Sequence, residues 1–157
     1  IKINSSLVSP QNRNRLYWTN IPHIAQPNDK GMLLKDVLED VNEVKGTITP
    51  KKYSPESLCH HIGDADNING HESIKRVYAG SGKSPTLNSC SVCETEDTDP
   101  NIYNGVYYRK LTPVECERLQ TVPDNYTNHV SKTQRYKMLG NGWTVDVICH
   151  ILKNITL

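Results

Sequence analysis

A chain of 157 residues is long enough for one ordinary domain, but only 36% of it is hydrophobic and Phe is absent. We therefore expect a piece of a larger fold. The 18 basic residues nearly balance the 17 acidic ones, which excludes the bulk positive charge of a histone-like nucleic-acid binder. No apolar run reaches membrane-spanning length, so no membrane partner is expected. Five unevenly spaced cysteines favour a reducing cytoplasm over a disulfide scaffold.

The first twenty residues favour two extended segments. Residues 1–8 are strand-like, and after a turn at Ser9-Pro10 the β-branched and aromatic side chains of residues 13–19 again favour a strand. Side chains two residues apart on a strand point to the same side, which predicts that Arg13 and Arg15 share one face. On their own, two such arginines are more often a salt-bridged strand surface than a site.

The middle of the chain changes character at about residue 45. Before it, a short helix is predicted by apolar residues at helical spacing, Leu34, Val37, Leu38 and Val41. From 45 to 108 the periodicity fades, and Pro, Gly, Asn and Ser recur. We predict a small, irregular β-rich module there, with short strands near 47–48, 74–78 and 106–108.

One cysteine pair raises the question of a metal. Cys90 and Cys93 form a CxxC pair, and the possible further ligands upstream are Cys59, His60, His61 and His71. Thiolates and imidazoles are zinc ligands. A single pair without a second at regular spacing is more often structural or incidental in a cytoplasmic protein. We predict no metal site and keep a zinc module as the alternative.

The residues that follow Arg109 predict the start of a helix. Thr112 is suited to cap the helix, Pro113 to its first position, and Glu115 completes a capping box. Leu111 and Cys116 flank this cap as a hydrophobic staple. These signals predict a well-defined helix.

A second helix start follows near the C-terminus. The turn Gly140-Asn141-Gly142 leads to apolar residues at helical spacing, Val145, Ile148, Cys149 and Leu152. Such a turn at a helix N-terminus exposes backbone N–H groups, which is a natural place for a polar ligand, and Trp143 could offer it an aromatic surface. The alternative is a plain helix entry.

Four segments, in order, resemble motifs of DNA cytosine-carbon-5 methyltransferases. Residues 11–15, QNRNR, resemble their QxRxR segment, and residues 109–126 resemble RxLTPxExxRLQGFPDxY. Residues 140–145 resemble the last motif of the family. Residues 83–87, KSPTL, resemble the segment that often precedes the end of the target recognition region. The details favour the bacterial and phage branch, which implies a cytoplasmic protein of a bacterial or phage-infected cell.

The resemblance covers nearly the whole chain, but three family motifs are missing. The chain has no Pro-Cys dipeptide, which carries the nucleophile, no Glu-Asn-Val and no Phe-x-Gly-x-Gly cofactor loop. Thr121-Val122 also stands where Gly-Phe is usual. The chain therefore looks like the C-terminal half of such an enzyme, inactive without its N-terminal catalytic half, as a separate subunit or as part of a longer chain.

The resemblance implies a role for each matching position. Arg15 would reach O2 of the flipped cytosine and stabilise charge on the ring, and Arg13 would support that site or a nearby phosphate. Asn141, Gly142 and Trp143 would complete the S-adenosylmethionine pocket.

The DNA contacts implied by the resemblance come from one segment. Thr86 would contact the backbone of double-stranded DNA near the flipped nucleotide, beside Ser84 and Lys83. Loops of the recognition region would read the bases in the major groove.

The fold class implied is an α/β fragment: a strand and a C-terminal helix of a Rossmann-like S-adenosylmethionine methyltransferase domain, plus a small, irregular β-rich target recognition domain. The expected boundaries are 1–22 for the catalytic-domain edge, 23–108 for the helix and recognition domain, 109–138 for the second helix and a hinge, and 139–157 for the C-terminal helix returning to the catalytic domain. Two alternatives stay open, namely a non-catalytic DNA-binding module and a fragment of an RNA cytosine methyltransferase.

Overall fold

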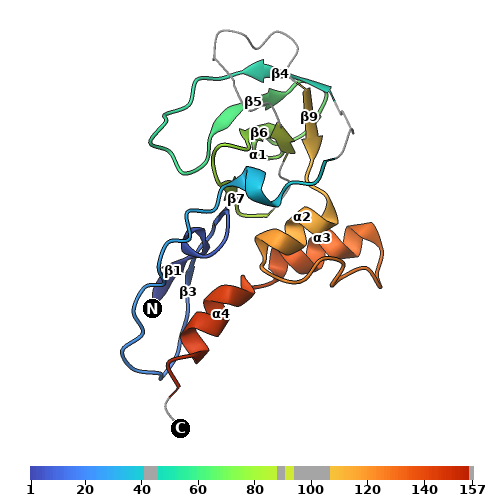
Figure 1. Cartoon of the computed structure of the whole chain (residues 1–157). Coiled ribbons are helices and arrows are strands. Elements are labelled where there is room, and N and C mark those ends of the chain that lie inside the picture. Colours follow the sequence, from blue (N-terminus) through green and yellow to red (C-terminus); the bar gives the residue numbers. More distant parts are fainter. Residues whose placement is uncertain (41–45, 88–90, 94–106, 156–157) are drawn as a thin grey trace.

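The computed structural model describes residues 1–40, 46–87, 91–93 and 107–155. The chain is elongated: a β-barrel lies at one end, α2 and α3 lie beside its base, and β1, β3 and α4 form the other end, where both termini lie (Figure 1). The strands are β1 (Lys2–Asn4), β2 (Gln11–Asn12), β3 (Asn14–Leu16), β4 (Gly46–Pro50), β5 (His61–Ala65), β6 (Arg76–Ala79), β7 (Ser84–Pro85), β8 (Ser91–Cys93) and β9 (Tyr107–Lys110). The helices are the 3₁₀ turns η1 (Ser5–Leu7) and η2 (Leu34–Val37), and α1 (Glu72–Lys75), α2 (Pro113–Leu119), α3 (Lys132–Asn141) and α4 (Val145–Leu152).

Strands β4, β5, β6, β8 and β9 close into the barrel, in which β6 and β8 pair in parallel and the other described pairs are antiparallel. Its interior is filled by small and branched side chains, Ile48, Ile62, Ala65, Val77, Ala79 and Tyr108. At Gly63 the β5–β6 register shifts, and a Cβ there would lie 2.6 Å from the Thr49 carbonyl oxygen, so glycine is required. The strands expected near 47–48 and 106–108 are present as β4 and β9; the stretch 74–78 starts as the end of α1 and becomes β6.

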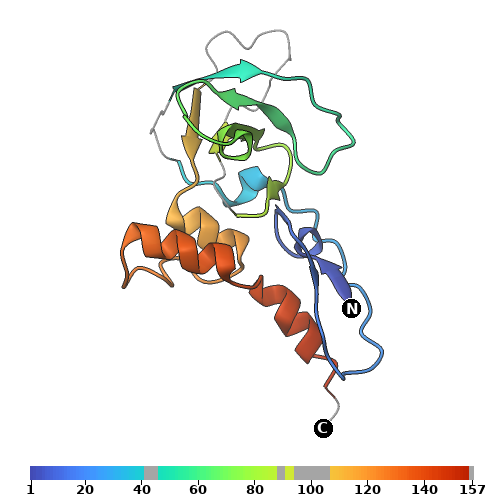
Figure 2. The same ribbon diagram turned by 180° about the vertical axis from the view of Figure 1, so that it is seen from behind.

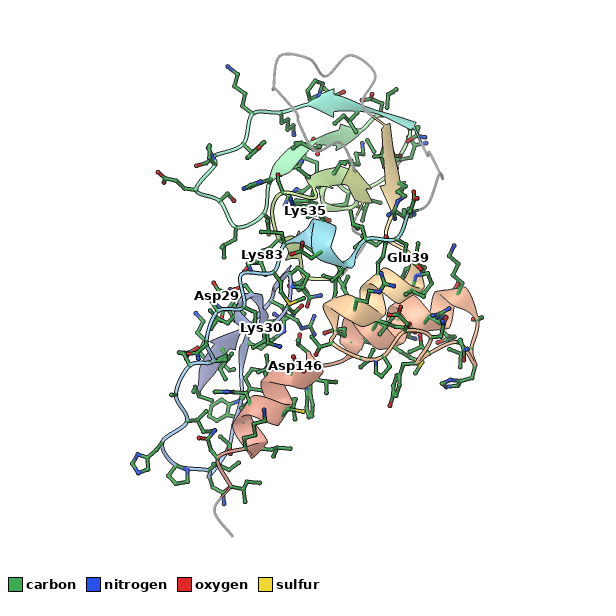
Figure 3. The ribbon with its side chains drawn as sticks, viewed as in Figure 1. Asp29, Lys30, Lys35, Glu39, Lys83 and Asp146 are labelled. Atoms are coloured by element: carbon green, nitrogen blue, oxygen red, sulfur yellow. The ribbon has the colours of Figure 1, made fainter. Side chains whose placement is uncertain are left out.

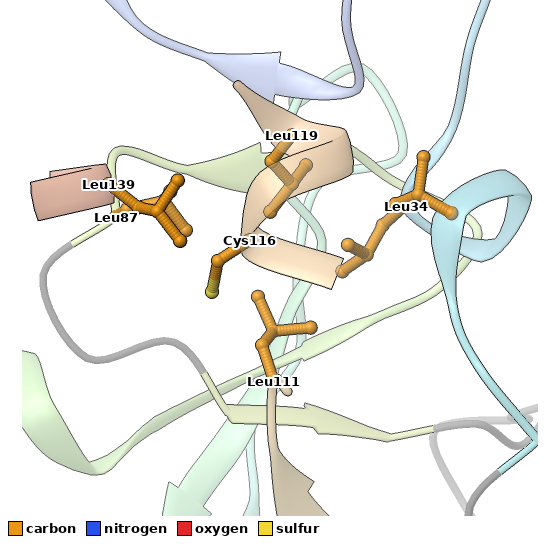
Figure 4. Close-up of a cluster of buried hydrophobic side chains, with 7 residues drawn as sticks. Leu34, Leu87, Leu111, Cys116, Leu119 and Leu139 are labelled. Atoms are coloured by element: carbon orange, nitrogen blue, oxygen red, sulfur yellow. The ribbon is translucent and has the colours of Figure 1, made fainter. Parts of the chain in front are cut away.

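A second core joins the barrel to the helices (Figure 4). It consists of apolar side chains from four segments that are separate in the sequence: Leu34, Val37, Leu87, Leu111, Cys116, Leu119 and Leu139. The helix expected over 34–41 is only the single turn η2, and Val41 lies outside the described residues. Leu34 and Val37 are nevertheless buried, so the apolar pattern reflected packing rather than a long helix.

The predicted start of α2 is confirmed. The Thr112 hydroxyl accepts a hydrogen bond from the Glu115 amide at 3.1 Å, and the Glu115 carboxylate accepts one from the Thr112 amide at 2.7 Å. Leu111 and Cys116 are both buried in the same core, as a hydrophobic staple requires. Local chemistry alone specifies this helix start.

Helix α3 was not predicted. It extends through Gly140 and Asn141, which were expected to form a turn, and it ends at Gly142. Leu139 is the only buried residue of α3. Because so little of this helix packs inward, its sequence shows only a weak apolar stripe. The missed signal is Ser131 followed three residues later by Gln134, a capping pattern whose Ser131 hydroxyl accepts from the Gln134 amide at 3.5 Å.

Helix α4 lies where it was predicted, but with the other face inward. Val147 and Ile151 are buried against Ile3 and Val8, whereas Leu152, from the predicted stripe, is 51% exposed. Apolar residues surround most of this helix, so two faces were available and periodicity did not choose between them. A helix that is apolar nearly all round usually has neighbours on several sides.

The first strands are shorter than expected. Strand β1 gives way to η1 because the Asn4 side chain accepts a hydrogen bond from the Ser6 amide. Strand β3 then returns antiparallel to β1, with Ile3 opposite Arg15. Arg13 sits between β2, which pairs with β7, and β3. The chain changes pairing partner at Arg13, so the expectation that Arg13 and Arg15 share one face is wrong: Arg13 is buried and Arg15 is exposed.

Candidate functional site

Arg13 links the start of the chain to its end. Its guanidinium is 6% exposed and donates hydrogen bonds to the carbonyl oxygens of Gly142, at 2.9 Å, and Gly140, at 3.4 Å. Burial, together with the charge of the neighbouring Arg15, lowers the pKa of Arg13, while Tyr17 opposes this. Carbonyl oxygens at the end of α3 therefore stabilise the buried cation. Two of the segments expected to form a site are thus in direct contact.

Arg15 has different surroundings. Its side chain is exposed, and its guanidinium donates to the carbonyl of its own neighbour Asn14 at 2.9 Å. The other N–H groups of the planar Arg15 guanidinium remain directed to solvent. Arg15 therefore fits the expected role of contacting a ligand better than Arg13 does.

The three residues expected to bind a cofactor lie at the junction of α3 and α4. Asn141 is exposed at the end of α3, and Trp143 is 66% exposed. The Gly142 amide, however, donates to the Met138 carbonyl at 2.8 Å and closes α3. The prediction that this turn offers free N–H groups to a ligand is therefore wrong for Gly142. Side chains, rather than that amide, are exposed at this junction.

A series of buried hydrogen bonds supports the junction of α3 and α4. The sequence analysis did not predict it. The Thr144 hydroxyl is fully buried, shares a hydrogen bond of 2.8 Å with the Ser5 hydroxyl and donates to the Gln120 side-chain oxygen at 3.1 Å. The Gln120 amide group donates in turn to the Leu139 carbonyl at 2.5 Å. These contacts join segments up to 139 residues apart, so no local pattern could have revealed them.

Lys83 and Ser84 lie inside the protein. Lys83 is 6% exposed, and its ammonium donates to the carbonyl oxygens of Ser6, at 2.6 Å, and Met32, at 2.9 Å, with Asp29 4.0 Å away (Figure 3). Ser84 is fully buried. The expectation that these two side chains bind DNA is corrected, because neither is accessible to a ligand here. The Lys83 ammonium instead ties β7 to the first segment of the chain.

Thr86 remains accessible. Its side chain is half-buried, and its hydroxyl donates to the Asn12 carbonyl at 3.4 Å, a long hydrogen bond. On the neighbouring strand, Gln11 is the first residue of β2 and lies opposite Ser84 of β7. Gln11 is fully buried, and within the described part of the chain its side-chain amide has no hydrogen-bond partner.

A second buried network holds the base of the barrel. Arg109, at the end of β9, makes a bidentate ion pair with Glu115, at 2.6 and 2.8 Å, and also donates to the Glu39 carbonyl. The Glu39 amide donates to the same Glu115 carboxylate at 2.8 Å, and Thr112 donates to the Glu39 carboxylate. The segment that precedes the barrel and the last strand of the barrel are therefore both bound to one carboxylate on α2.

The described residues contain neither a metal-binding group of side chains nor a helix suited to span a membrane. Among them there is no group of three or more His, Cys, Asp or Glu side chains arranged to hold a metal ion. Cys90 lies outside the described residues, as does the side chain of Cys93, so the zinc alternative is untested there. In the same described part, no helix has the length and apolar character needed to cross a bilayer.

Comparison with known proteins identifies the family of this fold and site. The family model for C-5 cytosine-specific DNA methylases matches residues 5–157. The chain belongs to this family.

Its relatives include the type II methyltransferase M.HhaI of Haemophilus parahaemolyticus, 36% identical over 93% of this chain and 49% of the relative. Another is M.SsoII of Shigella sonnei, 32% identical over 93% of this chain and 40% of the relative. Among solved structures, the Entamoeba histolytica methyltransferase EhMeth superimposes with a TM-score of 0.62 at 15% identity, covering 98% of this chain and 51% of that one. The chain spans about half the length of the relatives that it matches.

Proposed function

We propose that this chain is the C-terminal part of a DNA cytosine-carbon-5 methyltransferase. In this proposal it supplies DNA target recognition and completes an active site and a cofactor site whose other walls belong to the N-terminal catalytic half. The chain alone is inactive, because it lacks the Pro-Cys nucleophile and the main cofactor motifs. Its place of action is the cytoplasm.

One observation carries this proposal furthest. Arg13 holds the carbonyls of Gly140 and Gly142, so the motif with the proposed catalytic arginine is joined to the motif with the proposed cofactor residues. Such a connection is expected in an enzyme that must hold the base and the methyl donor in a fixed relative geometry. A DNA-binding module without catalysis would not need it.

Each accessible residue has a proposed task. The exposed Arg15 guanidinium stabilises negative charge on the oxygen of the flipped cytosine. Asn141 and Trp143 contact S-adenosylmethionine, which supplies the methyl group when bound. Thr86 positions the DNA backbone without reading sequence. Arg13 acts through Gly142 and is a positioning residue.

The proposed domain organisation follows the connections between these elements. Residues 1–22 and 139–157 form the catalytic-domain edge, on which α4 packs through Ile3 and Val8. Residues 23–108 contain η2 and most of the barrel and act as the recognition domain, and residues 109–138 comprise α2 and a hinge.

The partner half is proposed to cover the apolar surface at the lower end of the molecule. Seven large hydrophobic side chains are exposed on the first segment, at the junction and on the last segment: Ile1, Leu16, Trp18, Trp143, Val145, Leu152 and Ile155. An exposed apolar group of this kind marks an interaction surface. The chain covers 40% and 49% of two relatives, and the missing Pro-Cys and cofactor motifs support an N-terminal catalytic half as the proposed occupant.

The test is incorporation of labelled methyl groups into double-stranded DNA. We expect no incorporation by the chain alone and clear incorporation when it is co-purified with an N-terminal half that contains Pro-Cys. An Arg15→Ala variant should lose at least about a hundredfold in rate, as for removal of one oxyanion-stabilising donor. Turnover by the isolated chain would refute the proposed inactivity.

The same samples separate the two alternatives. A non-catalytic DNA-binding module would retard DNA in a gel-shift assay without the other half and show no methylation with it. An RNA cytosine methyltransferase would transfer methyl groups to transfer RNA in preference to DNA when both compete. Preference for DNA that requires both halves is the result expected here.

A further inference from the structure

The turn after α2 contains a strained residue. Thr121 has a φ of +56°, in the left-handed region that β-branched side chains rarely adopt. Its amide donates to the Arg118 carbonyl at 3.0 Å, so the backbone is tied to the end of α2. Residues in such conformations persist only where surrounding interactions hold them.

The Thr121 hydroxyl bridges two helices. It donates to the carbonyl of Gln120 at 2.8 Å and accepts from the Asp146 amide at 2.9 Å. Asp146 is the second residue of α4, where the amides have no acceptor within the helix. Thr121 thus provides the hydrogen bond that an N-cap side chain ordinarily provides.

The residue in the N-cap position does not provide it. Thr144 makes no capping hydrogen bond, because its hydroxyl is turned into the protein toward Ser5 and Gln120. The first amide of α4, at Val145, is satisfied by the Gln120 carbonyl at 3.0 Å. Both acceptors for the start of α4 therefore come from the turn after α2, about 25 residues earlier in the chain.

We propose that Thr121 is a positioning residue that holds the start of α4 and, through it, the segment Gly142-Trp143. Arg13 fixes this segment on the side of the QxRxR strand, and Thr121 fixes it on the side of α2. The link to cofactor binding rests on the proposed function, whereas the capping contact does not. Thr121 itself touches neither substrate nor cofactor.

The capping contact is tested on the chain itself by amide hydrogen exchange at Asp146. Thr121→Val keeps the shape of the side chain and removes the hydroxyl, so we expect exchange about tenfold faster, the size of effect typical of a lost cap. Thr121→Ser keeps the hydroxyl and should stay close to the wild type. Thr121→Gly relieves the positive φ and also lacks the hydroxyl, so it gives the same comparison should the Val variant fail to fold. Unchanged Asp146 exchange in the variants without a hydroxyl would overturn the proposal.

The positioning role is tested with both halves together. Thr121→Gly should raise the Kd for S-adenosylmethionine and the KM for it by several fold, with kcat less affected and DNA affinity unchanged, and Thr121→Ser should restore both. Faster Asp146 exchange with unaltered S-adenosylmethionine affinity would reduce Thr121 to a stabilising cap and overturn its positioning role. If wild-type halves together show neither methylation nor cofactor binding, the proposed function fails, and the exchange experiment alone decides the capping claim.

Discussion

At the scale of single residues, Arg13 and Arg15 stand two positions apart but differ in burial and in hydrogen bonding. Arg13 is enclosed and bound to carbonyls at the end of α3, while Arg15 is exposed. Replacing Arg13 by Ala should lower the free energy of unfolding by about 2 kcal/mol, because the partly buried Gly142 carbonyl loses a charged donor. Arg15→Ala should change it by less than about 0.5 kcal/mol. Urea unfolding of both variants measures the difference.

Equal stabilities of these two variants would show that the Arg13 clamp contributes nothing to the fold. The expected pattern instead separates two functions: Arg13→Ala lowers stability and activity together, and Arg15→Ala lowers activity alone.

Lys83 offers a second contrast at this scale. Lys83→Met removes the ammonium from the Ser6 and Met32 carbonyls, which should cost about 1–3 kcal/mol of stability. The exposed Lys35 is the matched control, and Lys35→Met should leave stability unchanged. Since Lys83 is buried, neither change should alter the salt dependence of DNA binding by the two halves together. If DNA binding by Lys83→Met depended less on salt concentration than binding by the wild type, the expected contact of Lys83 with a phosphate would be supported after all.

At the scale of elements, Glu117 joins α2, α3 and the loop between them. Burial raises the pKa of this carboxyl, but hydrogen bonds from Thr127, Arg135 and Asn125 outweigh burial and hold the pKa below its usual value. A depressed pKa gives stability that is present above the usual glutamate pKa, about 4.3, and is lost as the pH falls through the folded-state value.

Glu117→Gln should therefore be less stable than the wild type at pH 7, and the difference should shrink below about pH 4. Thermal unfolding of both proteins from pH 7 to pH 3 measures this difference. A constant difference across this range would mean that the charge of Glu117 is not what holds these elements together.

The two faces of α4 make the next prediction. Ile151→Ala empties a buried site and should cost about 2–5 kcal/mol in the isolated chain. Leu152→Ala, one residue further on the exposed face, should leave the isolated chain within about 0.5 kcal/mol of the wild type. Leu152→Ala should nevertheless weaken association with the N-terminal half, measured by titration calorimetry. If association is unaffected, the partner does not cover this face.

These elements also show how far the sequence was informative. The start of α2 was predictable because its capping box and staple are local, within six residues. The burial of Lys83 was not, since its acceptors, Ser6 and Met32, are 77 and 51 residues away. The inward face of α4 was ambiguous because its sequence is apolar on two sides, so periodicity alone could not decide which side packs against Ile3 and Val8.

At the scale of the whole molecule, the barrel and the β1, β3 and α4 group lie at opposite ends, and α2 and α3 stand out to one side between them, as the view from behind also shows (Figure 2). The barrel occupies one end, and the proposed catalytic edge occupies the other. DNA bound by the barrel and a cofactor at the far side of the junction would therefore meet near the base of the barrel, where Thr86 and Arg13 lie close to the same strand pair.

The joint at Glu115 has a consequence for how such proteins change. Glu39 and Arg109 are 70 residues apart in the chain and are fastened to the same carboxylate. For a closed segment of this size, each doubling of length costs only about 0.6 kcal/mol in loop-closure entropy. Loops of the barrel can thus lengthen or shorten during evolution while the helices outside the joint keep their positions, provided that Lys83 and Leu87, which contact the first segment and the second core, are retained.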